Sequence, residues 1–256
     1  MSDLTVVKIG GSTLGNHDTA LEDIAALQAE GSRLVVVHGG GSAATAWLKI
    51  HGVASEFVDG LRVTREDAID VVTAVFAGLV NKQLVASLQA LGAGALGLSG
   101  ADGGLLCTRQ IDERLGFVGE VMQVDRRPID ALLNAGYMPV ISSIGYWGDE
   151  PGQLMNVNAD TVAGEVAAAL GANDLIFLTD VAHVRGSEGE ALSELKADDV
   201  ETLVTSGVAS GGMIPKLRAG VTAAGAGARC YIVDGREARA LRNVMDGAAA
   251  GTRITA

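Results

Sequence analysis

Apolar residues along this chain gather into short runs, and longer segments with helical patterns separate them. The short runs predict buried strands, most of them parallel, at 5–9, 34–38, 94–98, 138–142, 174–179 and 228–233. The longer segments predict helices at about 19–30, 42–51, 66–90, 128–135, 160–170, 215–226 and 238–246. This alternation is typical of an open α/β sheet.

Two segments interrupt the alternation. Residues 104–124 have β character with a polar middle and predict an inserted hairpin. Residues 143–153 are rich in glycine and predict a loop or a second hairpin. A lobe boundary is expected near residues 171–173, where a predicted helix ends and a strand follows. The chain would then consist of an N-terminal lobe, 1–172, and a C-terminal lobe, 173–256.

Composition and charge exclude several function classes. The chain has 256 residues, 48% of them hydrophobic and 20% charged, which is typical of a globular protein with a well-buried core. Its formal net charge of −12 argues against a nucleic-acid partner, because phosphate contacts need a basic face. We find no signal peptide and no apolar run of the about 18 residues that span a membrane, so we expect a cytoplasmic protein without a membrane partner.

The cysteines and histidines show no metal-binding pattern. Cys107 and Cys230 are isolated, and neither a CxxC pair nor a Cys/His cluster occurs. We therefore expect two free thiols, as is usual in the cytoplasm, and no metal bound by the protein itself. For His38, His51 and His183 we expect structural or surface roles, since none of them pairs with a Ser, a Cys or a metal-like cluster.

The candidate chemistry begins where two strands end in glycine. Lys8 stands near the end of an apolar strand and is followed by Gly10 and Gly11, and a second strand ends in Gly39–Gly41. Glycine lets backbone N–H groups approach phosphate oxygens, and the following helix N-terminus adds positive potential. Ligands of open α/β sheets bind at the carboxyl ends of the strands, so Lys8 is interpreted as a phosphate contact, with a solvated surface lysine as the alternative.

The second glycine turn allows another interpretation. Together with Ala44 it fits the dinucleotide fingerprint G-x-G-x-x-A, and Asp59 follows at about the 20-residue spacing of that motif. Residues 52–60, however, are a poor match to the second buried strand that the motif requires. A plain tight turn remains a third possibility.

Polar residues also stand at the start of two later predicted helices. Asn156, Asn158 and Asp160 are more than one N-cap needs, so we expect them to bind a polar ligand or to orient nearby lysines. Lys216 lies in the first turn of a helix, where a positive charge opposes the helix dipole at a cost of up to about 1 kcal/mol. A bound phosphate would reverse that sign; an exposed lysine that tolerates the cost is the alternative.

Arg62 interrupts a β-like segment with a charged group. Its guanidinium fork can bind a carboxylate with two hydrogen bonds, although a surface arginine is an equally simple interpretation.

No short motif in this chain is specific by itself, but a series of them taken together resembles a known family. They are VKIGG at 7–11, VHGGG at 37–41, GLRVT at 60–64, VNK at 80–82, GLSGADG at 97–103, SSIG at 142–145, MNVNAD at 155–160, LTDV at 178–181, GGMIPK at 211–216 and GTRI at 251–254. In this order and spacing the chain resembles the amino acid kinase family over its whole length, and within it the enzymes that phosphorylate N-acetyl-L-glutamate. Two positions depart from the family pattern: His183 replaces a usual glycine, and Ser42 a common proline.

The resemblance implies a fold and a set of site residues. The fold would be a three-layer αβα sandwich with a mostly parallel, open central sheet. The N-terminal lobe would bind the acyl amino acid and mediate dimerisation, and the C-terminal lobe would bind ATP, with Mg²⁺ held through the nucleotide. The implied catalytic residues are Lys8 and Lys216, which would stabilise the transferring phosphoryl group, and Asp160, which would orient them. The implied substrate-binding residues are Gly40, Gly41, Arg62 and Asn156. The implied nucleotide-binding residues are Gly10, Gly11, Asp180, Val181, Ala182, His183, Val184, Arg185, Val208, Ala209 and Ser210.

The implied activity is ATP-dependent phosphorylation of the side-chain carboxylate of N-acetyl-L-glutamate, an early step of arginine biosynthesis. Such a carboxylate has a pKa of about 4 and is ionised at neutral pH, so the reaction needs no general base. One alternative is the kinase that acts on aminoadipate attached to a small acidic carrier protein, which a net charge of −12 disfavours. A dinucleotide-dependent oxidoreductase would leave Lys8, Lys216 and Asp160 without roles. A non-catalytic nucleotide sensor would not need both lysines.

The resemblance also bears on assembly and regulation. Relatives that arginine inhibits carry an extra N-terminal helix that helps to form hexamers. The first strand here is predicted to begin near Thr5. We therefore expect a homodimer that is insensitive to arginine.

Overall fold

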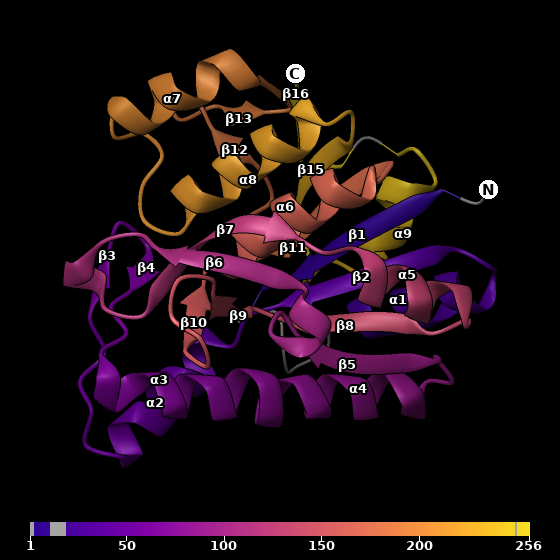
Figure 1. Ribbon diagram of the computed structural model, residues 1–256. Coiled ribbons are helices and arrows are strands. Elements are labelled where there is room, and N and C mark those ends of the chain that lie inside the picture. The colour runs from indigo at the N-terminus through magenta and orange to yellow at the C-terminus, as the bar shows by residue number, and fades with distance from the viewer. Residues whose placement is uncertain (1–2, 11–18, 249) are drawn as a thin grey trace.

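The computed structural model describes residues 3–10, 19–248 and 250–256, and at its centre is an eight-stranded sheet (Figure 1). The strand order is β14-β16-β15-β11-β1-β2-β8-β5. The strands are β1 Leu4–Ile9, β2 Arg33–His38, β5 Ala95–Ser99, β8 Met138–Ser142, β11 Asp174–Thr179, β14 Glu194–Lys196, β15 Arg229–Asp234 and β16 Thr252–Thr255. All six predicted strands are present and pair in parallel. The sequence analysis missed β14 and β16, because runs of three and four residues carry too little periodicity.

Helices cover both faces of this sheet, which confirms the expected three-layer αβα sandwich. One face packs against α5 Arg127–Asn134, α6 Ala159–Leu170, α7 Ala197–Thr205 and α8 Met213–Gly225. The other face packs against α1 Ala20–Ala29, α2 Gly41–Ile50, α3 Glu66–Thr73, η1 Ala74–Val80, α4 Asn81–Ala90 and α9 Ala240–Met245. Of these helices, the sequence analysis missed only α7. Two hydrophobic clusters, one on each face, form the core.

The predicted helix over 66–90 is one continuous helical run whose middle third, η1, is π-helical. The most apolar 18-residue window of this run has a mean hydropathy of 1.5, so the run is long and apolar enough to cross a membrane, which the sequence analysis did not recognise. Core helices pass the same test, and Val72, Phe76 and Leu84 are buried against the sheet. In its most apolar window 39% of the residues are buried, and the exposed positions of the run are small or polar residues such as Ala74, Gly78 and Lys82.

Two hairpins stand beside the main sheet and close into a small four-stranded barrel. Its strands are β6 Leu106–Gln110, β7 Val118–Val124, β9 Ile144–Trp147 and β10 Leu154–Val157. The antiparallel pairs β6–β7 and β9–β10 confirm the hairpins expected at 104–124 and 143–153. Two smaller hairpins are β3 Phe57–Val58 with β4 Leu61–Arg62, and β12 Val184–Arg185 with β13 Ala191–Leu192.

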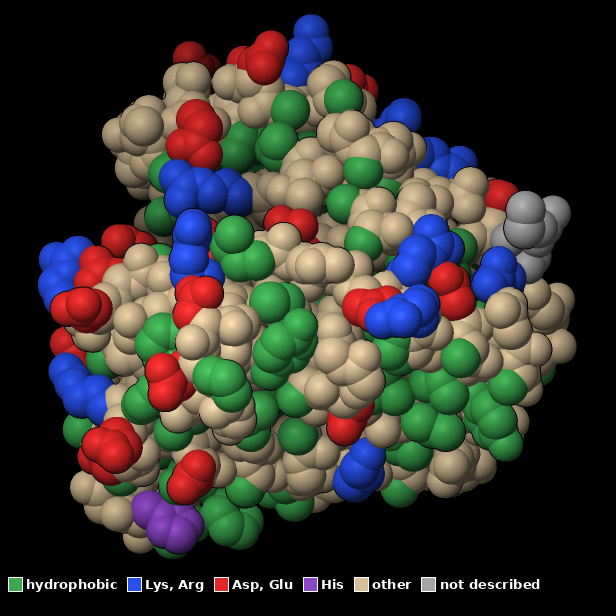
Figure 2. Space-filling model, in the orientation of Figure 1, with side chains coloured by type: hydrophobic (Ala, Val, Ile, Leu, Met, Phe, Trp, Pro, Cys, Tyr) green, Lys and Arg blue, Asp and Glu red, His purple; other side chains and the backbone are tan. Residues whose placement is uncertain are grey.

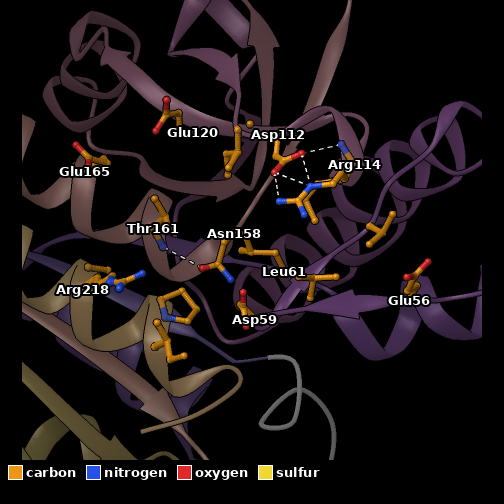
Figure 3. Close-up of a pocket in the computed structure, with 18 of the residues that line it drawn as sticks. Glu56, Asp59, Leu61, Asp112, Arg114, Glu120, Asn158, Thr161, Glu165 and Arg218 are labelled. Atoms are coloured by element: carbon orange, nitrogen blue, oxygen red, sulfur yellow. Dashed lines mark hydrogen bonds and ion pairs between the residues drawn. The ribbon is translucent and has the colours of Figure 1, made fainter. Parts of the chain in front are cut away.

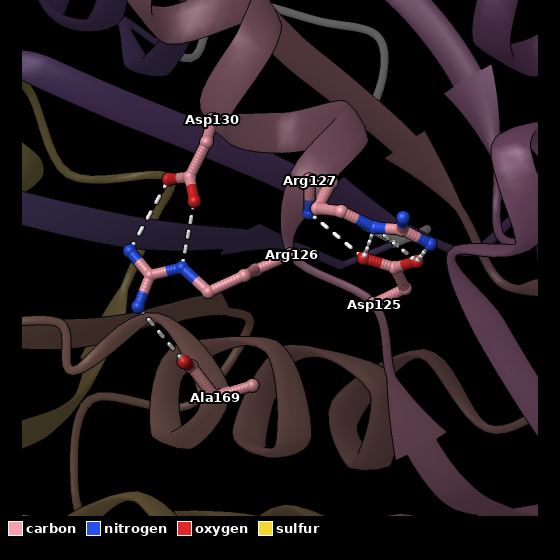
Figure 4. Close-up of polar contacts among 5 residues, drawn as sticks. All are labelled: Asp125, Arg126, Arg127, Asp130 and Ala169. Carbon is pink, nitrogen blue, oxygen red and sulfur yellow. Dashed lines mark hydrogen bonds and ion pairs between the residues drawn. The ribbon is translucent and has the colours of Figure 1, made fainter.

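Ion pairs form at the start of α5, where the chain leaves the barrel (Figure 4). Arg126 binds Asp130 one turn later, at 2.7 Å, and also donates to the carbonyl oxygen of Ala169 near the end of α6. Arg127 binds Asp125. Exposed pairs of this kind contribute at most about 1 kcal/mol each, so they orient the helix more than they stabilise it.

The expected lobe boundary falls at the end of α6, where Gly171 has a left-handed backbone with a φ of 61°. Strands after residue 173 lie on one side of β1 in the sheet, and β2, β5 and β8 lie on the other. Because one sheet runs through both parts, the division into lobes 1–172 and 173–256 stays a prediction.

Candidate active site

The alternation of side chains along β1 directs Lys8 toward the helices on one face of the sheet. Val6 joins the cluster under α6 and α8, whereas Val7 joins the opposite cluster. Side chains two positions apart share a face, so Lys8 points the same way as Val6. On that face Asp160 stands in the first turn of α6, and Lys216 stands in the first turn of α8.

These three residues form a buried ion triad. A single oxygen, Asp160 Oδ1, lies 2.7 Å from Lys8 Nζ and 2.9 Å from Lys216 Nζ. None of the three is more than 7% exposed. The structure therefore brings together Lys8, Lys216 and Asp160, as the sequence analysis expected of its catalytic residues.

The triad carries a surplus of positive charge. Burial raises the pKa of Asp160, but the charges of the two lysines and their hydrogen bonds outweigh burial and lower that pKa below its ordinary value. Burial also lowers the pKa of Lys216, although Asp160 acts in the opposite direction. One ionised carboxylate between two ammonium groups leaves one net positive charge. Such a centre is suited to bind an anion.

Arg62 is a second buried cation, and its surroundings differ. It donates to Ser55 Oγ at 2.8 Å, to the carbonyl oxygen of Gly41 at 2.8 Å and to Thr45 Oγ1 at 2.7 Å. The Phe57 ring centroid lies 4.6 Å from its guanidinium carbon. Arg62 is 6% exposed, and it forms no ion pair within the described part of the chain. Burial lowers its pKa accordingly.

Two asparagines close to the triad have different uses. Asn158 Oδ1 accepts from the backbone N–H groups of Asp160 and Thr161, at 2.9 and 3.1 Å. Asn158 is thus the N-cap of α6, and the side chain of Asp160 is left for the lysines. Asn156 stands on β10 and donates from Nδ2 to Thr64 Oγ1 at 2.9 Å.

A cavity of about 160 Å³ is lined by two members of the triad, Lys8 and Asp160, and by Arg62. Its lining includes Lys8, Gly39, Gly40, Gly41, Phe57, Arg62, Phe76, Ser143, Asn156 and Asp160. All four residues expected to bind substrate therefore lie on one cavity. Phe76 was not predicted. It comes from the π-helical segment, and a Cβ at Gly40 would lie only 2.9 Å from its ring, so the close packing here requires glycine.

His38 ends β2 behind this glycine turn and is fully buried. Its Nδ1 lies 2.7 Å from the Gly39 carbonyl oxygen, and its Nε2 lies 2.9 Å from Asn81 Nδ2. Since an amide nitrogen only donates, Nε2 accepts and Nδ1 carries the proton. Burial lowers the pKa of His38 to about 4, and the charges of Lys8 and Lys82 act in the same direction. The structural role expected for His38 agrees with this placement.

A second cavity, of about 430 Å³, lies at the carboxyl end of β11. Its lining includes Asp180, Val181, Ala182, His183, Val184, Arg185, Val208 and Ala209, which are eight of the residues expected to bind nucleotide. Ser210 accepts from the backbone N–H of Met213 and leads into α8. The Gly10 N–H donates to the carbonyl oxygen of Leu178, one residue before β11 ends. Gly11 lies outside the described residues.

A third cavity, of about 800 Å³, separates the hairpins from the outer sides of α6 and α8, and the sequence analysis predicted no site there (Figure 3). Figure 3 shows Glu120 and Glu165 on one side of this space and Glu56 on the other. Asp112 binds Arg114, the neighbouring arginine in its own loop, at 2.6 Å. Burial raises the pKa of the half-buried Glu165. Since these charged groups stand apart, they do not define a common ligand.

The dinucleotide interpretation of the glycine turn finds no support in the fold. Residues 57–62 form the short hairpin β3–β4, and Asp59 is at its tip with a φ of 49°. The second buried strand that this fingerprint needs after the helix is therefore replaced by a hairpin outside the main sheet.

Comparison with known proteins gives consistent results. The model of the "Amino acid kinase family" matches residues 3–234. The chain is 44% identical to "Acetylglutamate kinase" of Dehalococcoides mccartyi, covering 98% of this chain and 94% of that protein. It is 42% identical to "Acetylglutamate kinase, chloroplastic" of Arabidopsis thaliana, covering 98% and 74%.

Solved structures agree at the level of the fold. The crystal structure of smu.665 from Streptococcus mutans UA159 has a TM-score of 0.85 at 31% identity, covering 100% of this chain and 99% of that chain. A carbamate kinase from Giardia has a TM-score of 0.73 at 17% identity, covering 99% of each, and shares the fold.

Proposed function

This chain belongs to the amino acid kinase family, and we propose that it transfers the γ-phosphoryl group of ATP to the side-chain carboxylate of N-acetyl-L-glutamate. The products are N-acetyl-L-glutamate 5-phosphate and ADP, in arginine biosynthesis. The similarity to acetylglutamate kinases over nearly the whole chain supports this choice. The observation that carries it is the ion triad, whose Lys8 and Asp160 share one cavity with Arg62, a buried cation that forms no ion pair with any described residue.

At the phosphoryl end, the triad would act by charge. A carboxylate oxygen of the acceptor forms a bond to the γ-phosphorus while the bond from that phosphorus to the β–γ bridging oxygen breaks. Negative charge on the transferring oxygens would be stabilised by Lys8 and Lys216, and Asp160 would keep the two ammonium groups together. The acceptor is already ionised, so positioning and charge are the main requirements.

At the acceptor end, Arg62 would bind the second carboxylate of the substrate. The guanidinium is buried among neutral acceptors, so an anionic ligand would supply the missing counter-charge. Backbone N–H groups of Gly40 and Gly41 and the amide of Asn156 would hold the remaining polar groups.

The nucleotide would lie in the second cavity, beside Asp180 and His183. Within residues 3–10, 19–248 and 250–256 no cluster of three or more His, Cys, Asp or Glu side chains could hold a metal ion. We therefore propose that Mg²⁺ enters on the phosphates of ATP, where it would neutralise part of their charge.

A turnover assay with hydroxylamine trapping of the acyl phosphate tests this proposal. It compares N-acetylglutamate, glutamate, N-acetylaspartate and carrier-linked aminoadipate as acceptors. We expect ADP and a trapped hydroxamate in quantity with N-acetylglutamate alone. A preference for carrier-linked aminoadipate, or no turnover with any acceptor, would contradict the proposal. A parallel run with millimolar arginine checks the expected insensitivity.

We extend the proposal to a cytoplasmic homodimer. The edge strand β5 and the outer face of the helical run 66–90 adjoin each other, and Figure 2 shows apolar side chains exposed in this region. A second subunit would cover both surfaces. Light scattering after gel filtration should give twice the chain mass of 26.0 kDa, and a monomer or a hexamer would contradict this assembly.

A further inference from the structure

We infer that Thr64 is a positioning residue, whose hydroxyl turns the amide of Asn156 so that Oδ1 faces the acceptor and selects a substrate that offers an N–H group there. The inference rests on the proposed function and adds a residue and a selection rule to it. Thr64 is fully buried, and Asn156 is 6% exposed.

The Thr64 hydroxyl has a single hydrogen to donate. Oγ1 lies 3.0 Å from the carbonyl oxygen of Arg62 and 2.9 Å from the side-chain amide of Asn156. A carbonyl oxygen only accepts, so the hydroxyl hydrogen is used for Arg62. The contact with Asn156 must then be one in which Thr64 accepts. Only Nδ2 of that amide can donate, and the orientation of the amide is fixed by this count.

The fixed orientation determines what Asn156 offers to a ligand. With Nδ2 turned to Thr64, the other end of the amide is Oδ1, a pure acceptor. Asn156 lines the cavity of about 160 Å³ together with Gly40 and Arg62. In the described residues no group donates to Oδ1. A ligand donor is therefore the natural partner for this oxygen.

An N-acyl amino acid has such a donor, the N–H of its acylamino group. The corresponding ester, in which oxygen replaces that nitrogen, has nearly the same shape and carries an acceptor instead. A site built around a buried acceptor rejects such an analogue, because the acceptor is left without its hydrogen bond. Thr64 would thus select the acylamino group without touching the substrate.

The backbone holds both residues in place for this task. The carbonyl oxygen of Thr64 accepts from the N–H of Phe117 at 2.7 Å, and the carbonyl oxygen of Phe117 accepts from the N–H of Asn156 at 2.9 Å. The N–H of Thr64 also donates to Leu115 at 2.9 Å. Thr64→Val keeps these backbone bonds and the side-chain shape, so we expect it to fold.

The test measures KM for N-acetyl-L-glutamate and for its ester analogue, 2-acetoxyglutarate, at saturating ATP. In the unaltered enzyme we expect the ester KM to be about tenfold higher, the value of one lost hydrogen bond. In Thr64→Val the amide can turn over, so the ratio of the two KM values should fall toward one while KM for ATP is unchanged. Thr64→Ser, which keeps the hydroxyl, should restore the ratio.

Two further variants keep the test decisive. In Thr205→Val, a matched change at an exposed hydroxyl on α7, the ratio and both KM values should stay as in the unaltered enzyme. In Asn156→Ala the ratio should also approach one, which tests the selection rule even if Thr64→Val does not fold. A ratio that survives in either Thr64→Val or Asn156→Ala overturns the inference alone. No turnover of N-acetylglutamate by the unaltered enzyme overturns the proposed function, and the inference with it.

Discussion

The two ends of the candidate active site both bury positive charge, but only one of them neutralises part of it. At the phosphoryl end, Asp160 accepts from Lys8 and Lys216 through one oxygen. At the acceptor end, Arg62 is equally buried, and its hydrogen-bond partners among residues 3–10, 19–248 and 250–256 are all neutral. The triad therefore has a counter-charge of its own in the free protein. Arg62 is a cation that a ligand has to neutralise.

This difference predicts opposite consequences for stability. Removing the anion of the triad leaves two buried ammonium groups close together, which is destabilising. Removing the guanidinium of Arg62 takes away a buried charge that no described residue neutralises, so this change should not be destabilising. We therefore expect Asp160 to stabilise the fold and Arg62 to bind a substrate without stabilising the fold.

Breaking the triad should have the largest effect. Lys8→Ala and Lys216→Ala should each lower kcat by about 10²–10³-fold, because each removes charge stabilisation of the transferring group. The fold should survive, since Asp160 keeps one lysine. Asp160→Ala should instead lower the free energy of unfolding by about 3–5 kcal/mol. Steady-state kinetics measures kcat, and denaturant titration measures the free energy of unfolding. Lys49→Ala, at an exposed lysine, is the control. A near-normal kcat in either lysine variant removes that residue from the mechanism.

Changing Arg62 should affect substrate binding without a loss of stability. Arg62→Met should raise KM for N-acetylglutamate by about 10–100-fold, the value of hydrogen bonds to a charged group, with little change in KM for ATP. Its free energy of unfolding should be equal to that of the unaltered protein or higher. Arg65→Met, at an exposed arginine paired with Glu56, is the matched control. Strong destabilisation by Arg62→Met would show that Arg62, like Asp160, stabilises the fold.

His38, which ends β2 behind the glycine turn, should make stability depend on pH. Its pKa is about 4 in the folded protein against 6.5 ordinarily, so the unfolded chain binds the proton first as pH falls. The folded state should lose up to about 3 kcal/mol between pH 6.5 and pH 4 from this group, and nothing above pH 7. Denaturant titrations of His38→Asn across this range should show a shallower fall. An equally steep fall in the variant would assign the acid sensitivity to other groups.

The smallest effect is expected at the contact between the β3–β4 turn, near the acceptor end, and the residues just before α8, near the phosphoryl end. Gly60, in the β3–β4 turn with a φ of 80°, approaches Gly211 so closely that a Cβ would lie 2.6 Å from its carbonyl oxygen. Gly52→Ala, at a φ of 73° with open space around it, has the same backbone strain without the collision. Gly52→Ala should lose about 1 kcal/mol from this strain, and Gly60→Ala should lose more because of the added collision. Gly60→Ala alone should also lower kcat, because the hairpin is pushed away from the start of α8. Equal kinetics in the two variants would show that this contact is unimportant.

The local pattern of apolar, polar and glycine residues was sufficient to predict most of the strands and helices. The six parallel strands carry continuous apolar runs, and glycine turns and polar residues mark their ends, so elements and candidate ligand groups could be placed along the chain. Asn158 illustrates this, because its capping role depends only on residues two and three positions away. Short strands such as β16 were missed, since pairing with β15 rather than their own pattern stabilises them.

The amino-acid sequence by itself determined which ionisable groups stand at the ends of strands and helices, because side-chain period and turn chemistry are local properties. Only the tertiary structure decided that Lys8 and Lys216 meet on one oxygen, that Arg62 has no counter-ion among the described residues, and that Thr64 reaches Asn156, 92 residues away. The physical reason is that such contacts depend on strand order and helix packing. These bring together segments whose local patterns of apolar and polar residues carry no information about their distance from one another.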